Sequence, residues 1–230
     1  MTGGGIDSLG GAVPQDSRGH QRPGWTVLLI GGPSGAGKST AARAIGQRLG
    51  CSWLQVDDFR LAFERSRVTL SHGTKALSFF LMPAHDLWVQ APERLRDGLI
   101  GVGEALAPAL EVVIENHIDQ QAPAIIEGDG ILPALLGRTV VRARTTGGRL
   151  RAVFVIEPDE EAILSNMRAR GRGFDERTDR EQRTQARMNW LYGQWLHAEA
   201  GRYDLPVVEA RPWGTLAERI LATAETVHDQ

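Results

Sequence analysis

Eight residues from Gly32 to Ser39 have the types and the spacing needed to bind a phosphate chain. They read G-x-x-x-x-G-K-S, which is the pattern of a phosphate-binding P-loop. Glycines allow successive backbone N–H groups to turn inward around a phosphate, because no Cβ obstructs the turn. Lys38 then supplies a positive charge for the β- and γ-phosphates, and the Ser39 hydroxyl is placed to bind Mg²⁺. The predicted nucleotide-binding set is Gly32, Pro33, Ser34, Gly35, Ala36, Gly37, Lys38, Ser39 and Thr40.

The segments on both sides of this loop are those that a phosphate-binding loop requires. Residues 25–30 form an apolar, β-branched run typical of a buried strand, and residues 41–49 are helix-forming. A dinucleotide-binding fingerprint is excluded, because the sequence G-A-G-K-S-T lacks the third glycine of G-x-G-x-x-G. The order strand, loop, helix therefore favours a nucleotide-phosphate site over a chance glycine-rich turn.

Two acids and an arginine follow the next strand candidate, which is predicted at 52–56. The strand runs into Asp57, Asp58 and Arg60. Ligands of open α/β sheets bind at the carboxyl ends of the strands, so we expect this cluster beside the phosphate loop. Asp57 directly follows the strand and is our candidate for the general base of a transfer reaction, or for a ligand in the Mg²⁺ shell. Asp58 and Arg60 are candidates for binding the substrate, and one of the two aspartates is expected to cap the following helix.

A further acid follows a short apolar strand candidate at 124–126. Glu127 occupies a Walker-B-like position, from which a carboxylate can hold the hydration shell of Mg²⁺. Asp129 lies between two glycines, where an ordinary turn acid is the stronger alternative. We include Glu127 as a candidate metal ligand and Asp129 as a candidate substrate-binding residue.

An arginine-rich stretch at 168–177 follows the fourth predicted strand at 150–156. Arginines two positions apart do not share a helix face, and two glycines interrupt the stretch, so we predict a flexible loop. After this strand a loop can fold over a bound triphosphate as a lid. This makes Arg170 and Arg172 candidate catalytic residues and Arg168 a candidate nucleotide ligand; a solvated charge run is the alternative.

The long region between the second and third strands is mostly helical by pattern. It covers residues 61–118, with an interruption near 82–86 and a helix start at Pro92. Its apolar positions at helical spacing indicate a core-facing side. We expect this region to enclose the substrate.

The C-terminal part alternates again between helices and strands. A capping box at 178–181 begins a helix with a predicted apolar stripe at Met188, Leu191 and Trp195. Trp213 lies in the loop after the last strand and suits either a contact with an adenine ring or a packing role. The other expected elements are an exposed connection at 138–151, a helix at 158–167, a strand at 206–210 and a closing helix from 215.

Length and composition predict one ordinary domain. The chain has 230 residues, 42% of them hydrophobic, and a formal net charge of −2, which gives no indication of a nucleic-acid partner. Residues 1–23 are polar and glycine-rich, and we predict a disordered leader there. No apolar run approaches the ~20 residues of a membrane span. Cys51 is the only cysteine, so no intramolecular disulfide is possible, and we predict a cytoplasmic protein.

The order of these motifs resembles the small-molecule kinases of the P-loop fold, such as uridine kinase, gluconate kinase, adenylylsulfate kinase and chloramphenicol phosphotransferase. The stretch from Ile125 to Pro133 is also similar to proteins related to 2-phosphoglycerate kinase. The resemblance implies an α/β fold, with a parallel five-stranded sheet in the order 2-3-1-4-5 and helices on both faces. It also implies ATP with Mg²⁺ and transfer of the γ-phosphoryl group to a hydroxyl or phosphate of a small molecule. In this view residues 24–230 form the kinase domain, with a substrate-covering region at 61–118 and a lid at 168–178, acting as a monomer or homodimer.

A second class of function stays open at this point. A nucleotide-binding or slowly hydrolysing regulatory protein would share the phosphate loop. A GTPase is disfavoured because the sequence has no Asn-Lys-x-Asp motif. Among kinases, a nucleoside-monophosphate acceptor is one possibility, with Arg60 serving its phosphate.

Overall fold

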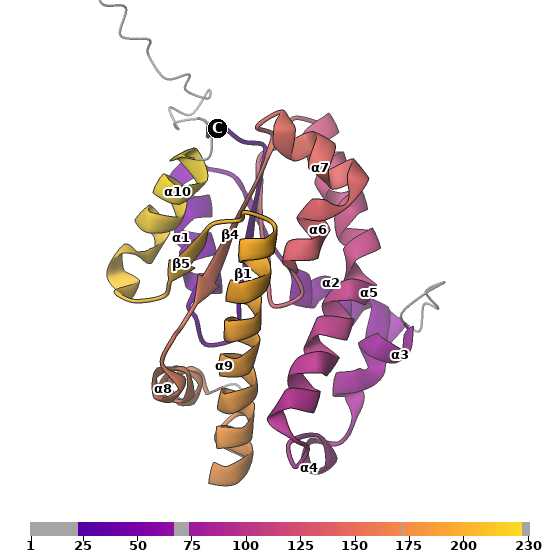
Figure 1. Ribbon diagram of the computed structural model, residues 1–230, viewed down its shortest axis with the longest axis vertical. Helices are drawn as coiled ribbons and strands as arrows, with labels where there is room; N and C mark the ends of the chain where they lie inside the picture. Colours follow the sequence, from indigo (N-terminus) through magenta and orange to yellow (C-terminus); the bar gives the residue numbers. More distant parts are fainter. Residues whose placement is uncertain (1–22, 67–73, 172, 227–230) are drawn as a thin grey trace, which may run out of the picture.

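A five-stranded parallel sheet forms the centre of the molecule in this computed structural model, which describes residues 23–66, 74–171 and 173–226 (Figure 1). The strand order β2-β3-β1-β4-β5 confirms the predicted 2-3-1-4-5 arrangement of a P-loop fold. The strands are β1 (Val27–Gly31), β2 (Ser52–Gln55), β3 (Ala124–Gly128), β4 (Leu150–Ile156) and β5 (Val207–Glu209). In this register Ile30 of β1 lies opposite Glu127 of β3 and Val153 of β4. The predicted Walker-B-like acid therefore lies beside the strand that leads into the phosphate loop.

Helices cover both faces of the sheet, and the alternation of side chains along β1 shows why. Leu28 and Ile30 pack into the core on one face, whereas Val27 and Leu29 pack into the core on the other. The first face is covered by α1 (Lys38–Leu49) and α10 (Leu216–Thr226) (Figure 1). The second face is covered by α5 (Pro92–Asp119), α6 (Pro133–Gly137), α7 (Thr139–Thr146) and α9 (Asp179–Arg202). Both faces are apolar, as expected for a parallel sheet.

The segment between β2 and β3 is helical in its described part, as predicted. Its first elements are α2 (Val56–Ser66), α3 (Thr74–Leu77), a 3₁₀ turn η1 (Ser78–Leu81) and α4 (Ala84–Leu87). Helix α5 then starts at Pro92, where the missing N–H of proline costs no helical hydrogen bond. In Figure 1, α3 and α4 lie beside the lower half of α5, away from the sheet.

The predicted end of the second strand is wrong by one residue. The strand ends at Gln55, and Val56 is already the first residue of α2. Val56 is buried against Gly128, where an added Cβ would lie 2.6 Å from the Cβ of Val56. Because glycine lets Val56 approach this closely, the chain turns at once into a helix. Asp57 therefore belongs to the first turn of α2.

Two segments that were predicted as non-helical connections are helical in part, and the described residues from Gly171 to Thr178 form turns, as predicted. Helix α8 (Glu160–Arg170) continues into the arginine-rich stretch and ends at Gly171, which has a left-handed φ of 64°. The predicted connection at 138–151 contains α7, because Val141 is fully buried against the second face of the sheet. Local arginine and glycine content misled the prediction where tertiary packing decides the structure.

Helix α9 begins as predicted but buries a different stripe. Thr178 and Glu181 form the predicted capping box. The buried side runs through Met188, Tyr192 and Leu196, whereas Leu191 is only half-buried. The closing helix α10 follows a short 3₁₀ turn η2 (Trp213–Thr215).

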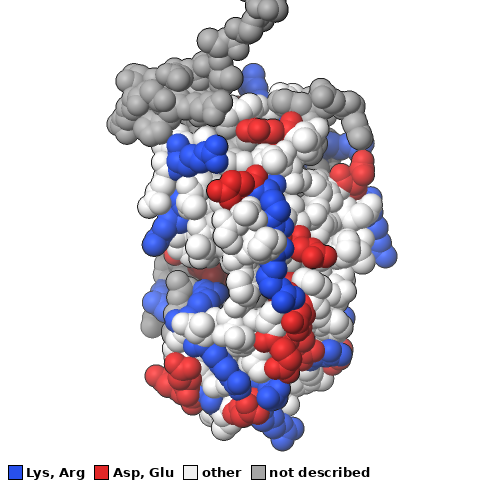
Figure 2. Space-filling model, turned by 90° about the vertical axis from the view of Figure 1, so that its left-hand side faces the viewer, with Lys and Arg blue, Asp and Glu red and all other residues white. Residues whose placement is uncertain are grey.

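Several predictions concern residues or properties outside these elements. The predicted leader at 1–23 lies outside the described residues except for Pro23, and Arg172 also lies outside them. In the part of the chain that the structure describes, no helix has the length and apolarity needed to cross a membrane. Acidic and basic side chains intermix on the face shown in Figure 2, without a broad region of one sign.

Candidate nucleotide and acceptor site

The phosphate loop has the backbone conformation that its glycines permit. Gly32, Gly35 and Gly37 have φ values of 148°, 89° and 81°, a range that side-chain-bearing residues rarely adopt. At Gly32 a Cβ would also lie 2.2 Å from the carbonyl oxygen of Val155. The loop thus packs tightly on β4 and leads directly into α1. A helix N-terminus carries a partial positive charge that favours a bound anion.

Lys38, the first residue of α1, lies between two oxygen acceptors. Its Nζ donates hydrogen bonds to the Pro33 carbonyl at 2.8 Å and to the Asp129 carboxylate at 2.7 Å, and its side chain is 5% exposed. Asp129 also accepts a hydrogen bond from the Ser34 hydroxyl at 2.7 Å. This acid was predicted to bind substrate, with a simple turn as the alternative. The structure places it against the phosphate loop as the charge partner of Lys38.

Ser39 and Glu127 are the described residues at the loop that could hold a Mg²⁺ ion. Glu127 is buried and accepts a hydrogen bond from the Ser39 side chain. Burial raises the pKa of Glu127, while Lys38 and the Ser39 hydrogen bond act in the opposite direction. No group of three or more His, Cys, Asp or Glu side chains among the described residues could hold a metal alone. This donor set fits Mg²⁺, which takes most of its ligands from phosphates and water.

Asp57 and Arg60 lie side by side on α2. The Arg60 Nε lies 3.6 Å from the Asp57 carboxylate, and Arg60 also forms a 3.2 Å ion pair with Glu64. The pKa of Asp57 is raised by its partial removal from water and by the nearby Asp129 carboxylate. Its side chain is still 61% exposed in an open cavity, so water moderates this effect. Asp58 is exposed and lines neither of the two cavities described below.

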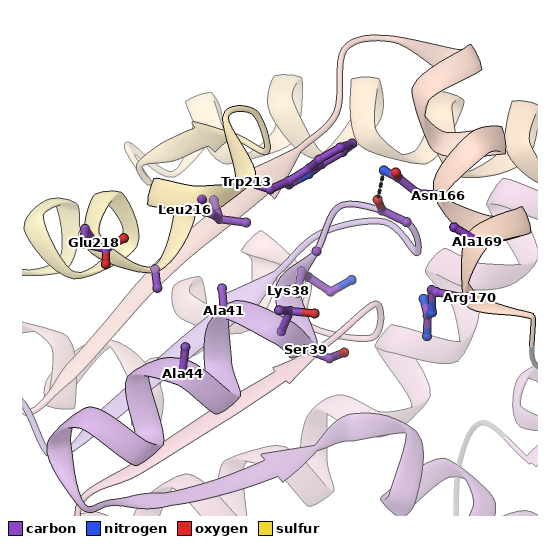
Figure 3. Close-up of a pocket in the computed structure, with 15 residues that line it drawn as sticks. Lys38, Ser39, Ala41, Ala44, Asn166, Ala169, Arg170, Trp213, Leu216 and Glu218 are labelled. Atoms are coloured by element: carbon purple, nitrogen blue, oxygen red, sulfur yellow. Dashed lines mark hydrogen bonds between the residues drawn. The ribbon is translucent and has the colours of Figure 1, made fainter.

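A cavity of about 670 Å³ opens on one side of the phosphate loop (Figure 3). Trp213 and Leu216 border it from η2 and α10, and Arg170 borders it from α8. The floor is formed by residues of the loop and of α1, including Lys38 and Ser39. Trp213 is 44% exposed, so one face of its ring is available to a planar group. The cavity has a flat aromatic wall at one end and phosphate-binding groups at the other.

A second cavity of about 320 Å³ opens on the other side of the same loop. Ser34 lines this cavity, whereas the next residue in the chain, Gly35, lines the larger one. Its polar groups are Ser34, Asp57, Arg60, Asp129, Arg177, Gln185 and Asn189. Its remaining wall comes from apolar side chains of the helical region between β2 and β3 and from Met188. The two cavities therefore border the phosphate loop at neighbouring residues, and Lys38 lines the larger one while its partner Asp129 lines the smaller one.

The predicted lid arginines have different surroundings. Arg170, at the end of α8, lines the larger cavity. Arg168 points to α9, where its guanidinium donates to Gln182 at 2.8 Å and to Asp179 at 2.5 Å. Arg168 lines neither cavity, so its predicted contact with the nucleotide has no support from this arrangement.

Several polar residues that the sequence analysis did not identify hold the loop in place. The Asn189 side chain accepts a hydrogen bond from the Ser34 amide at 2.9 Å, and the Asn166 side chain donates one to the Gly35 carbonyl at 2.9 Å. The fully buried Tyr192 hydroxyl donates to the Asp129 carbonyl, and burial holds the pKa of Tyr192 well above its usual value. Asn189 and Tyr192 lie three positions apart on α9, and polar groups at this spacing within an apolar stripe were the available signal.

Comparisons with known proteins found a curated relative and several solved structures that are similar to this chain. A 2-phosphoglycerate kinase from Methanopyrus kandleri is 27% identical over 147 residues, which cover 64% of this chain and 44% of that relative. The chain thus matches less than half the length of this relative. A gluconokinase structure from Sinorhizobium meliloti 1021 has 16% identity and a TM-score of 0.48, covering 90% of this chain and 95% of that one. A shikimate kinase structure from Acinetobacter baumannii has 17% identity and a TM-score of 0.47, covering 90% and 96%.

A family model described as an AAA domain matches residues 27–192. The match begins at β1, includes the phosphate loop, Glu127 in β3 and Asp129 after it, and ends at Tyr192 on α9. It therefore covers most of the chain and the whole phosphate loop, whereas Trp213 and Leu216 of the larger cavity lie beyond it. The chain belongs to the AAA domain family.

Proposed function

We propose that this protein transfers the γ-phosphoryl group of ATP to a hydroxyl or phosphate group of a small molecule. The observation that carries the proposal is the pair of cavities on opposite sides of one phosphate loop. The larger cavity suits the nucleotide, because Trp213 can stack on a base while the loop surrounds the phosphates. The smaller cavity suits the acceptor, because it adjoins the loop next to the Lys38–Asp129 pair. A group bound there would lie within reach of the terminal phosphate.

Each polar residue at the loop has a role in this proposal. Lys38 binds the β- and γ-phosphates and exchanges its contact with Asp129 for them. Ser39 and Glu127 would hold Mg²⁺, which when bound would neutralise charge on the phosphates. Asp57 takes the proton of the acceptor hydroxyl, and its raised pKa makes it a better proton acceptor than an ordinary aspartate. Arg170 stabilises the charge that spreads over the transferring group.

The relatives support the reaction type without identifying the acceptor. The protein from Methanopyrus kandleri is named 2-phosphoglycerate kinase, which makes phosphoryl transfer the first activity to test. Its matched region is under half of that protein, so its substrate is only one member of a panel. A cytoplasmic location and a monomeric or homodimeric state stay predictions.

An acceptor screen tests the proposal. The protein with ATP and Mg²⁺ is incubated with separate pools of sugars, sugar acids, phosphorylated acids, nucleosides and nucleoside monophosphates, and ADP release is measured. We expect one pool to raise ADP release well above the rate without acceptor, and mass spectrometry to find an added phosphate on one member. ADP release that is the same in every pool, with free phosphate as the product, would indicate a hydrolysing regulatory protein instead.

A further inference from the structure

Arg177 lines the smaller cavity and has hydrogen-bond donors that a ligand could satisfy. It lies in the turn between α8 and α9, and Gln182 fixes this turn by donating hydrogen bonds to the carbonyls of Phe174 and Arg177, both at 3.1 Å. The guanidinium carbon lies 4.6 Å from the centre of the Trp88 ring and 5.7 Å from that of Phe174. These contacts hold the plane of the guanidinium but satisfy none of its N–H donors.

One nitrogen of this guanidinium is buried without a hydrogen-bond partner among the described residues. This atom is the Nη1 of Arg177. The Oε1 of Gln185, a residue that lines the same cavity, is also buried without a hydrogen-bond partner in the described part of the chain. Burial also lowers the pKa of Arg177. A buried donor on a charged group is costly to leave unpaired, so native proteins rarely keep one without a partner or a ligand.

Arg60 forms ion pairs with neighbouring carboxylates, whereas no ion pair of Arg177 is found among the described residues. Arg60 has two carboxylates within 3.6 Å, Asp57 and Glu64. The acid that acts most on Arg177 is Glu181, whose carboxylate already accepts two hydrogen bonds from Thr178, from its amide and its hydroxyl, each at 2.8 Å. Of the two arginines that line the smaller cavity, Arg177 is therefore the one available to an anion.

We infer that the acceptor carries a carboxylate or phosphate group, which binds to the guanidinium of Arg177 while its phosphoryl-accepting group lies toward Asp57. This inference rests on the proposed function and specifies the acceptor of the same site. Asp57 and Arg177 line the same cavity of about 320 Å³, so one small molecule can contact both. Arg60, assigned in the sequence analysis to an acceptor phosphate, serves instead to orient Asp57.

A binding experiment tests this without requiring catalysis. The protein is saturated with the β,γ-imido analogue of ATP and Mg²⁺, so that all phosphate positions of the loop are occupied. Calorimetry then measures two matched pairs of probes, glycolate with glycolamide and glycerol 3-phosphate with glycerol. We expect at least one anion to bind at least tenfold more tightly than its neutral partner, and the better pair shows whether the group is carboxylate or phosphate.

Variants assign the binding to Arg177. Arg177→Met keeps the length of the side chain but removes the charge, and it should weaken binding of the preferred anion by at least tenfold. Arg177→Lys should bind the anion more tightly than Arg177→Met does, because lysine keeps the charge but lacks the forked donors of arginine. Arg180→Met, at an exposed position of α9 three residues away, is the control and should leave the affinity for the anion unchanged.

Three results would overturn the inference: no binding of either anion, equal binding of the neutral partners, or full binding by Arg177→Met with unchanged thermal stability. A failed acceptor screen would overturn the proposed function alone, because anion binding is measured here without phosphoryl transfer. A phosphorylated acceptor that has no anionic group would leave the proposed function standing and overturn the role of Arg177.

Discussion

At the scale of single residues, Lys38 shows how narrowly the site is fitted. Its Nζ lies between the Pro33 carbonyl and the Asp129 carboxylate, and the side chain is almost fully enclosed. A guanidinium is wider and planar, so Lys38→Arg cannot occupy the same position. We expect this variant to lose roughly 10²-fold or more in kcat, since small displacements of catalytic groups cost that much. Steady-state ADP release measures it, and near-normal turnover would remove Lys38 from the transfer step.

We predict that the ionised Glu127 carboxylate lowers the free energy of unfolding, although the proposed function needs it as a ligand of Mg²⁺. Its raised pKa means that the folded protein favours the protonated acid, so its contribution to stability is present at low pH and is lost as pH rises. Glu127→Gln should therefore raise the Tm at pH 8, and each 1 kcal/mol of added stability corresponds to roughly 2–4 °C in a domain of this size. The gain should vanish near pH 4, where wild-type Glu127 is itself protonated. The same variant should lose most of its Mg²⁺-dependent activity.

Scanning calorimetry at the two pH values checks this prediction. Glu104→Gln, at an exposed position in the middle of α5 and outside both cavities, is the control and should leave the Tm unchanged at both. A Tm for Glu127→Gln below that of wild type at pH 8 would mean that the Glu127 carboxylate stabilises the fold.

At the scale of elements, the last turn of α8 places two arginines in different surroundings. Arg170 borders the larger cavity, whereas Arg168 is bound to Gln182 and Asp179 on α9. We expect Arg170→Ala to lower kcat by about 10³-fold, as loss of a charge-stabilising arginine does in related chemistry. Arg168→Ala should change kcat little and lower the Tm. Pre-steady-state transfer rates compare the two, and equal kcat values for both variants would contradict a catalytic role for Arg170.

The turn that follows β5 supplies the expected base contact. Trp213 is partly exposed over the larger cavity, opposite the arginine end of α8 (Figure 3). Loss of base stacking should weaken nucleotide binding, so Trp213→Ala is expected to raise the Kd for ATP by about tenfold or more. Trp213→Phe keeps an aromatic ring and should retain most of the affinity. An unchanged Kd in Trp213→Ala would make Trp213 a packing residue, the alternative that its sequence position left open.

At the scale of the whole molecule, the arrangement of strands and helices could be predicted from the sequence better than the contacts of the site. The glycine pattern and the apolar runs predict the phosphate loop and the strands, because they depend on local conformation and on burial of whole strands. The strand order was implied by the resemblance to P-loop kinases, and the structure has this order. The Lys38–Asp129 pair, the Asn189 contact and the position of Arg177 join segments far apart in the chain. Such contacts arise only when the sheet brings β3, α9 and the loop together, and no local pattern encodes them. For the same reason α7 was missed.

The central claim is that phosphoryl transfer takes place between two cavities that meet at one loop, with Asp57 receiving the proton. The most direct test is single-turnover transfer from labelled ATP to the acceptor found in the screen, measured for wild type, Asp57→Asn and Asp58→Asn beside nucleotide titrations. Asparagine keeps the shape of Asp57 but accepts no proton, so we predict unchanged ATP affinity and transfer slowed by about 10²–10⁴-fold, while Asp58→Asn transfers at nearly the wild-type rate. Transfer at the wild-type rate in Asp57→Asn would contradict the account, and loss of Mg²⁺–ATP binding would make Asp57 a ligand of the metal shell.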